Sequence, residues 1–157
     1  MPSILVTPVK GLFQQAGTTA IPNGSISGHK SVTKAAATSS TTTLTAADSG
    51  KVILVASNAA AVVLPAVAAG LQFTFVFAAD YATAASTVTA AGTALLVGGG
   101  STGAGGKIKG NASDHNRLAS ASSQKAGDRF ACVCDGTNWL ITDFYADGAA
   151  TFAFSAA

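Results

Sequence analysis

Short apolar runs separated by turn residues recur along most of the chain. LQFTFVFA (71–78) alternates, which places its leucine and three phenylalanines on one face of a strand. VILVAS (52–57) is continuous and β-branched, as is typical of a strand buried on both faces. Runs of this kind predict about nine strands, at residues 41–45, 52–57, 61–65, 71–78, 86–90, 93–97, 129–134, 138–145 and 151–156.

The segments between these runs carry turn signals. Asp48-Ser49-Gly50 predicts a turn, and Asp135-Gly136-Thr137 predicts a hairpin between two strands. GGGSTGAGGKIKGNASDHN (98–116) is predicted to be a long flexible loop. No segment of useful length has the helical period, and no internal repeat of fixed period is apparent. The fold class expected is therefore all-β, a β-sandwich or jelly roll, over residues 39–157.

Residues 1–38 differ from the rest of the chain. Two short apolar patches precede AGTTAIPNGSISGHKS, which has the Gly, Ser, Asn and Pro content of irregular chain. We interpret 1–38 as an extended N-terminal arm, and the alternative is a disordered leader. Isolated apolar patches favour an arm that docks on another surface. The candidate contact residues of the arm are Ile4, Leu5, Val6, Leu12 and Phe13.

The composition points to a surface that few charged side chains cover. Only 10% of the residues are charged, against about 25% in typical globular domains, and the chain has no Glu. Such a composition suits β structure and a surface partly hidden in an assembly. The net charge of +2 and the isolated pair Lys107 and Lys109 give no argument for a nucleic-acid partner.

Neither a secretory leader nor a membrane span is expected. MPSILVTPVK lacks the basic start and the long apolar run of a signal peptide. The stretch 59–79 is apolar enough to resemble a membrane span, but Pro65, Gly70 and the alternation after them favour two buried strands and a loop.

The two cysteines form a CxC pair. In a strand, Cys132 and Cys134 point to the same face, and a disulfide between positions i and i+2 is strained. Without further Cys or suitably placed His, the pair is a poor metal site. We expect two reduced, buried thiols, no metal, and maturation in a reducing cytoplasm.

Motifs that would carry catalysis are weak. Residues 98–103 match GxGxxG, but no helix follows and no acidic residue lies about 20 positions on, so no dinucleotide or other cofactor is predicted. Asp114-His115 reads as a polar loop pair, and no GxSxG elbow supports a nucleophile. Alternation places Asp143 on one face with Trp139, bordering solvent or a subunit contact. We expect no catalytic residue and no enzyme activity.

Two segments resemble a module of bacteriophage virion proteins. TTTLTAADSGKVILVASNAAAVVLPAVAAGLQFTFVF carries an "LT..DSGK" turn, a short "LP" strand and "G..FTF". GDRFACVCDGTNWLI is similar to the closing hairpin of the same family, with its "GD", "DGT" and "W". Together they cover residues 41–78 and 127–141. The family includes capsid decoration (cement) proteins and head or tail fibres.

The resemblance implies a small, non-catalytic β-sandwich, usually a homotrimer. Fibre proteins normally add a long repetitive shaft, which this chain lacks, so the resemblance favours a decoration protein on the capsid exterior. Its partners would be the major capsid protein and other copies of the chain, with no nucleic acid and no membrane. Phe152 and Phe154 are expected in the core or in a subunit interface, and the core candidates are Val52, Ile53, Leu54, Phe73, Phe75, Phe77 and Trp139.

Two other classes of function remain open. A phage fibre or receptor (carbohydrate)-binding module would need exposed aromatic side chains, for which Tyr81, Trp139 and Tyr145 are the candidates. A hydrolase on a β scaffold would draw on Asp114, His115 and Asp143.

Overall fold

The computed structural model describes residues 3–7, 11–15, 32–35, 41–80, 84–102, 107–110, 114–120, 124–147 and 152–157. Strands dominate these residues, and the helical content is one short 3-10 turn, η1. The strands are β1 (Ser3–Thr7), β2 (Gly11–Gln15), β3 (Val32–Ala35), β4 (Thr41–Thr43), β5 (Val52–Val55), β6 (Ala61–Val63), β7 (Gln72–Phe77), β8 (Thr87–Thr89), β9 (Leu96–Thr102), β10 (Lys107–Gly110), β11 (Arg117–Ser120), β12 (Arg129–Cys134), β13 (Trp139–Ala146) and β14 (Phe152–Ser155), with η1 at Ala46–Asp48.

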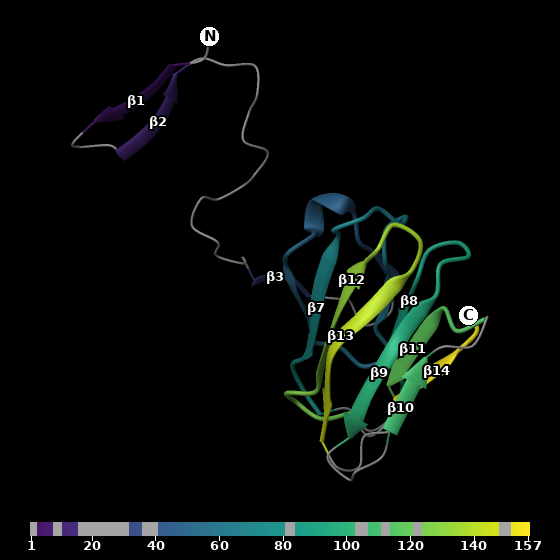
Figure 1. Ribbon diagram of the computed structural model, residues 1–157. Helices are drawn as coiled ribbons and strands as arrows, with labels where there is room; N and C mark the ends of the chain where they lie inside the picture. Colours follow the sequence, from purple (N-terminus) through teal and green to yellow (C-terminus); the bar gives the residue numbers. More distant parts are fainter. Residues whose placement is uncertain are drawn as a thin grey trace.

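Two large sheets enclose the core (Figure 1). One has seven strands in the order β10-β9-β13-β12-β7-β5-β3, and the other has five in the order β14-β11-β8-β6-β4. Buried apolar side chains from both sheets form one cluster between them. The predicted all-β sandwich is confirmed. Both sheets are mixed, however, which distinguishes them from the purely antiparallel sheets of a jelly roll.

Four of the five parallel pairings among the described residues come from a coil that the sequence did not reveal, and the fifth joins β13 to β9. From β3 to β8 the chain alternates between the two sheets, so each strand pairs in parallel with the strand two before it. β3, β5 and β7 begin at Val32, Val52 and Gln72, a spacing of 20 residues at each step. The strands therefore repeat at a fixed spacing, although the amino-acid sequence does not repeat from one turn of the coil to the next.

Aromatic side chains from neighbouring strands fill the core. Phe73, Phe75 and Phe77 alternate with half-buried or exposed residues along β7, as predicted. Phe75 stacks on Phe130 of β12 with ring centroids 4.6 Å apart, and Phe73 lies 5.6 Å from the Trp139 ring. Each such side chain contributes about 1.5–3 kcal/mol through burial.

The prediction that β5 is buried on both faces is wrong. Ile53 and Val55 are buried, whereas Val52 and Leu54 are half-buried. Of the core candidates, only these last two therefore lie off the core. Their side of β5 belongs to the outer face of the seven-stranded sheet.

The predicted glycine-rich loop is also wrong, because its first part is strand. β9 runs through Gly98, Gly99 and Gly100 to Thr102, and β10 pairs with it in antiparallel orientation. Gly98 has φ +117 and lies against Ile141, and a Cβ on Gly100 would lie 2.5 Å from the Phe144 Cβ. The glycines allow β9 to approach the side chains of β13.

Two strand pairings involve residues 1–38, one within this range and one between it and the sandwich. β1 pairs with β2 in antiparallel orientation as a separate two-stranded sheet, with Leu5 opposite Phe13 and Val6 opposite Leu12. β3 joins the edge of the seven-stranded sheet beside β5. Residues 32–35 of the predicted arm therefore belong to the sandwich. For the residues before β3, an extended arm stays a prediction.

Among the described residues, the structure contains no helix of the length and hydropathy required to span a bilayer.

Candidate functional site

The "LT..DSGK" motif forms a braced turn ahead of β5. The Asp48 Oδ2 accepts hydrogen bonds from the Thr45 backbone N–H and hydroxyl, both at 2.9 Å. Its Oδ1 lies 2.9 Å from the Lys51 Nζ. Gly50 has φ +84, which favours glycine, and its N–H donates to the Gln72 carbonyl. The motif residues therefore fasten the turn to β7.

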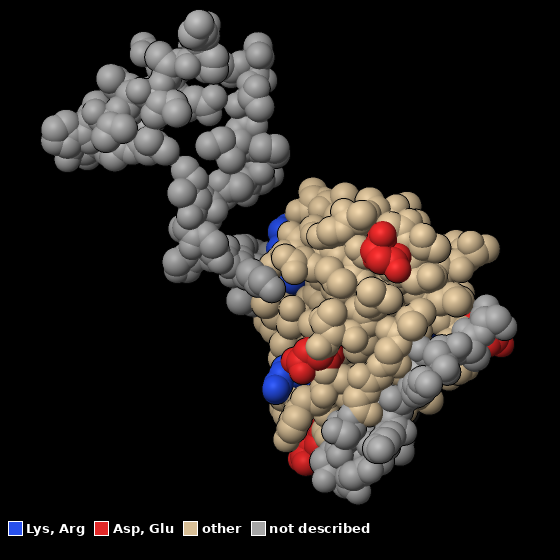
Figure 2. Space-filling model, viewed as in Figure 1, with Lys and Arg blue, Asp and Glu red and all other residues tan. Residues whose placement is uncertain are grey.

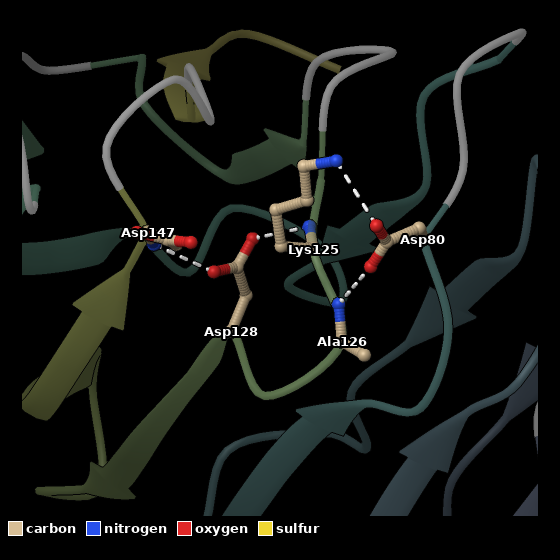
Figure 3. Close-up of polar contacts among 5 residues, drawn as sticks. All are labelled: Asp80, Lys125, Ala126, Asp128 and Asp147. Atoms are coloured by element: carbon tan, nitrogen blue, oxygen red, sulfur yellow. Dashed lines mark hydrogen bonds and ion pairs between the residues drawn. The ribbon is translucent and has the colours of Figure 1, made fainter.

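At the other end of the sandwich, Asp128 of the "GD" motif and Asp80 join three chain segments (Figure 3). Asp128 is fully buried; its Oδ2 accepts from the Lys125 N–H at 2.8 Å and its Oδ1 from the Asp147 N–H at 2.7 Å. Asp80, just after β7, accepts from the Ala126 N–H at 2.8 Å and pairs with the Lys125 Nζ at 3.0 Å. Both carboxylates thus hold the turn before β12.

The hydrogen bonds to Asp80 shift the pKa values of both Asp80 and Lys125. The Ala126 N–H and then the Lys125 ammonium lower the pKa of Asp80 below its usual value. Asp80 in turn raises the pKa of Lys125. No local pattern predicted this pair, because 45 residues separate the two side chains.

The "DGT" motif is a third turn braced by a carboxylate. The Asp135 Oδ1 accepts from the backbone N–H groups of Asn138 and Thr137, both at 2.7 Å. These bonds lower the pKa of Asp135. The hairpin between β12 and β13 that this motif predicts is confirmed.

The two segments that carry the motifs interlock. β7 of the first pairs with β12 of the second in antiparallel orientation. The Gly70 N–H donates to the Cys134 carbonyl, and the Cys134 N–H donates to the Leu71 carbonyl. The Trp139 ring of the second segment packs on Phe73 of the first. Residues read as two separate patterns in the sequence therefore form one continuous body.

The candidate hydrolase residues lie in two different settings. Asp114 and His115 are adjacent, with the His115 Nε2 4.0 Å from an Asp114 carboxylate oxygen, and the imidazole stacks against the Phe154 ring. Asp143 lies on β13, and its Oδ2 is 3.5 Å from the Arg129 Nε. Among the described residues, no three His, Cys, Asp or Glu side chains gather as metal ligands would.

The prediction that Asp143 shares a face with Trp139 is wrong. The pairing of β13 with β12 shifts by one residue after Cys132–Ile141, so that Ala131 faces Asp143. This bulge reverses the alternation: Trp139 is buried, whereas Asp143 is exposed. Asp143 and Tyr145 therefore lie on the outer face of the sheet.

Both cysteines are buried free thiols on the inner face of β12, as predicted. Burial raises the pKa of the Cys132 thiol to about 12. Because the thiolate is the nucleophile and the Cys134 thiol is buried away from the reagent, we expect neither cysteine to react with a disulfide reagent such as DTNB in the folded protein at mildly alkaline pH. Both should react in concentrated guanidinium chloride. Rapid labelling of the folded chain would contradict the buried placement.

The candidate interface residues are placed as follows. Phe152 is buried, and its ring lies 5.4 Å from Phe77 and 5.2 Å from Phe144, within the core of the chain. Phe154 is half-buried at the margin of that core. The candidates of the arm lie on β1 and β2: Ile4, Leu5 and Val6 on the first, Leu12 and Phe13 on the second.

The three aromatic candidates for sugar binding differ in access. Trp139 is fully buried, which removes it. Tyr81 lies outside the described residues. Tyr145 is 45% exposed, and the Arg129 guanidinium lies 4.9 Å from its ring centroid.

A pocket of about 410 Å³ lies at one end of the sandwich. Its walls carry no ionisable group, being built from Ala66, Val67, Ala91, Gly92, Thr93, Ala94, Gly136 and Thr137. These residues could contact a ligand through apolar side chains, threonine hydroxyls and backbone groups, but they include no side chain for acid–base catalysis.

The outer faces of the two sheets differ in character. Three rows of neighbouring residues cross the seven-stranded sheet: Gln72, Val133, Leu140 and Val97; Val52, Thr74, Ala131 and Asp143; and Leu54, Val76, Arg129 and Tyr145. Two rows cross the five-stranded sheet: Thr41, Ala61, Thr87, Ala119 and Ala153; and Thr43, Val63, Thr89, Arg117 and Ser155.

We call the first of these surfaces the apolar face. Its six Val and Leu side chains are half-buried and lie outside the core cluster. β7, β12, β13 and β9 run side by side across Figure 1, and from the same direction Figure 2 shows mostly uncharged residues. Its ionic pair is Arg129 with Asp143. The alternation of RFACVC places Ala131 and Val133 on the face opposite the cysteines. It does not predict which residues of the neighbouring strands share that face.

Comparison with known protein families, with curated proteins and with solved structures finds no match.

Proposed function

We propose that this chain is a structural virion protein: a capsid decoration protein that binds the exterior of an assembled phage capsid as a homotrimer and stabilises it. The observation that carries the proposal is the interlocking of the segments 41–78 and 127–141. The virion-protein pattern was read in each segment separately, and the residues of that pattern form the turns and core of a single sandwich.

The carboxylates of the pattern also support a structural role. Asp48, Asp128 and Asp135 each accept at least two hydrogen bonds at a turn. These carboxylates hold the shape of the sandwich, and the outer faces of the two sheets, which carry few charges, are the surfaces available for binding.

The mechanism is multivalent attachment. A trimer over a threefold junction contacts several capsid subunits at once, so that individually weak contacts multiply. A protein that binds the assembled shell in preference to free subunits stabilises that shell by mass action. The residues before β3 supply a further contact, through the apolar residues of β1 and β2.

Co-sedimentation tests this function. Capsids assembled without the chain should bind it when mixed with it, and should then resist heating to a higher temperature. Deleting residues 1–31 keeps β3 in the sheet and should weaken attachment. The control is the unfolding temperature of the deleted chain, which should match that of the full chain. A folded full chain that stays in the supernatant would refute the proposal.

A carbohydrate-binding fibre module is the second candidate, and Tyr145 favours it. The phenol is exposed on a sheet face beside Arg129 and Asp143, which are polar groups suited to a sugar. A glycan array would show binding that Tyr145→Ala abolishes if this reading holds. An array without hits would eliminate it.

A further inference from the structure

We propose that the apolar face of the seven-stranded sheet is the surface by which copies of this chain bind one another. The inference rests on the homo-oligomer of the proposed function and deepens it by naming the interface.

The outer faces of the two sheets differ in composition. On the five-stranded sheet the outer rows consist largely of Thr, Ala and Ser, which water solvates or tolerates. On the seven-stranded sheet the equivalent positions include Leu54, Val76, Val133 and Leu140. Antiparallel and mixed sheets that face water on one side usually alternate apolar-in and polar-out. The five-stranded sheet follows that rule, and the seven-stranded sheet departs from it.

The area of the apolar face suits an interface between copies of the chain. Five adjacent strands about 4.8 Å apart, each presenting about six residues at roughly 3.4 Å per residue, give a face on the order of 500 Å². Three copies that turn this face toward a common threefold axis bury about 500 Å² each and about 1,500 Å² in total, which is the size of a specific protein–protein interface. The face alone is therefore large enough to hold the three copies of the proposed trimer together.

The charges on the apolar face, and the need to cover it before the capsid is met, both favour a second copy of this chain as the binding partner. Arg129 and Asp143 neutralise each other, so a second copy approaches without net repulsion. A decoration protein also has to stay in solution before it meets a finished shell. An apolar face left uncovered during that time promotes non-specific association. A second copy covers it from the start, whereas the capsid covers it only at the end.

Sedimentation equilibrium of the full chain with one pair of matched variants tests the inference. Val133→Lys places a charge on the apolar face, and Val63→Lys places the same charge on the outer face of the five-stranded sheet. Both valines are half-buried, and each lies between two paired strands. We expect the unmodified chain and Val63→Lys to be oligomers of equal mass and Val133→Lys to sediment at the monomer mass of 15.3 kDa.

A gentler variant covers the case in which Val133→Lys does not fold. Gln72 is exposed and faces Val133 in the register, so Gln72→Lys leaves the core untouched. Its dissociation constant for self-association should rise about tenfold or more, because a charge is buried without a partner.

Three results would overturn the inference, each in a different way. A monomeric full chain removes the interface altogether. An oligomer that survives Gln72→Lys and a folded Val133→Lys places the interface elsewhere. An intact oligomer that loses only its capsid binding in these variants makes the apolar face the capsid contact, and in that case the proposed function stands.

Discussion

Replacing Asp128 by alanine is expected to lower the free energy of unfolding by about 3–5 kcal/mol. The side chain is fully buried and accepts hydrogen bonds from the Lys125 and Asp147 N–H groups. Removing it leaves two backbone donors without their acceptor where water has little access, and each such donor costs about 1–3 kcal/mol. The same bonds join the turn before β12 to the end of β13 (Figure 3), so both strands should loosen.

Asp135→Ala is the matched control for this prediction. Asp135 also accepts from two backbone N–H groups, but in an exposed turn where water replaces the lost acceptor. Its loss should therefore lower the free energy of unfolding much less than the loss of Asp128. Urea denaturation followed by tryptophan fluorescence measures both values, since Trp139 lies in the core. Equal destabilisation of the two variants would contradict the role assigned to burial.

Gly100→Ala is expected to cost about 2–4 kcal/mol, a large effect for one methyl group. The new Cβ would lie 2.5 Å from the Phe144 Cβ and 2.8 Å from its Cδ1. The Phe144 Cβ is fixed to the backbone of β13, so a rotamer change does not relieve the overlap. β9 has to move away from β13, which weakens the pairing between them.

Gly92→Ala separates this overlap from the general cost of replacing a glycine. Gly92 has φ +63 and nothing within 4 Å of a built Cβ, so its replacement should cost about 1–2 kcal/mol from backbone strain alone. Thermal and urea unfolding of the two variants gives the comparison. If Gly100→Ala were as stable as Gly92→Ala, the close approach of β9 to β13 would be wrong.

Local patterns predicted the elements that depend on local rules. The alternation along β7 identified the buried phenylalanines, the Asp-Gly junction identified the β12–β13 hairpin, and the spacing of the cysteines placed both on one face. Each of these depends on residues within a few positions of one another. The all-β class followed from the same patterns together with the absence of Glu and of helical periodicity.

The features that the sequence did not predict all depend on a neighbour across the sheet. Gly98 and Gly100 read as a loop, because the side chains that require them, Ile141 and Phe144, lie about 43 residues later. The bulge in β13 exists only relative to β12, so strict alternation misplaced Asp143. The parallel coil likewise depends on which strand each turn meets, which apolar spacing alone does not specify.

Sequence patterns were also insufficient to predict the outer faces of the two sheets. Alternation tells which residues share a side of a strand, but not whether that side meets the core, water or a partner. Val52 and Leu54 were assigned to the core because they are apolar, and they lie on the apolar face. Val or Leu at a strand position indicates that the side chain is buried. The surface that buries it can be the core of the same chain or a partner molecule.

On the function proposed above, this chain acts by covering the exterior of an assembled capsid. Electron cryomicroscopy of capsids before and after addition of the purified chain tests it most directly. The account predicts added density on the outer surface at threefold junctions, into which copies of the β-sandwich fit with their apolar faces turned toward one another. Capsids whose outer surface is unchanged after saturation with folded protein would contradict it.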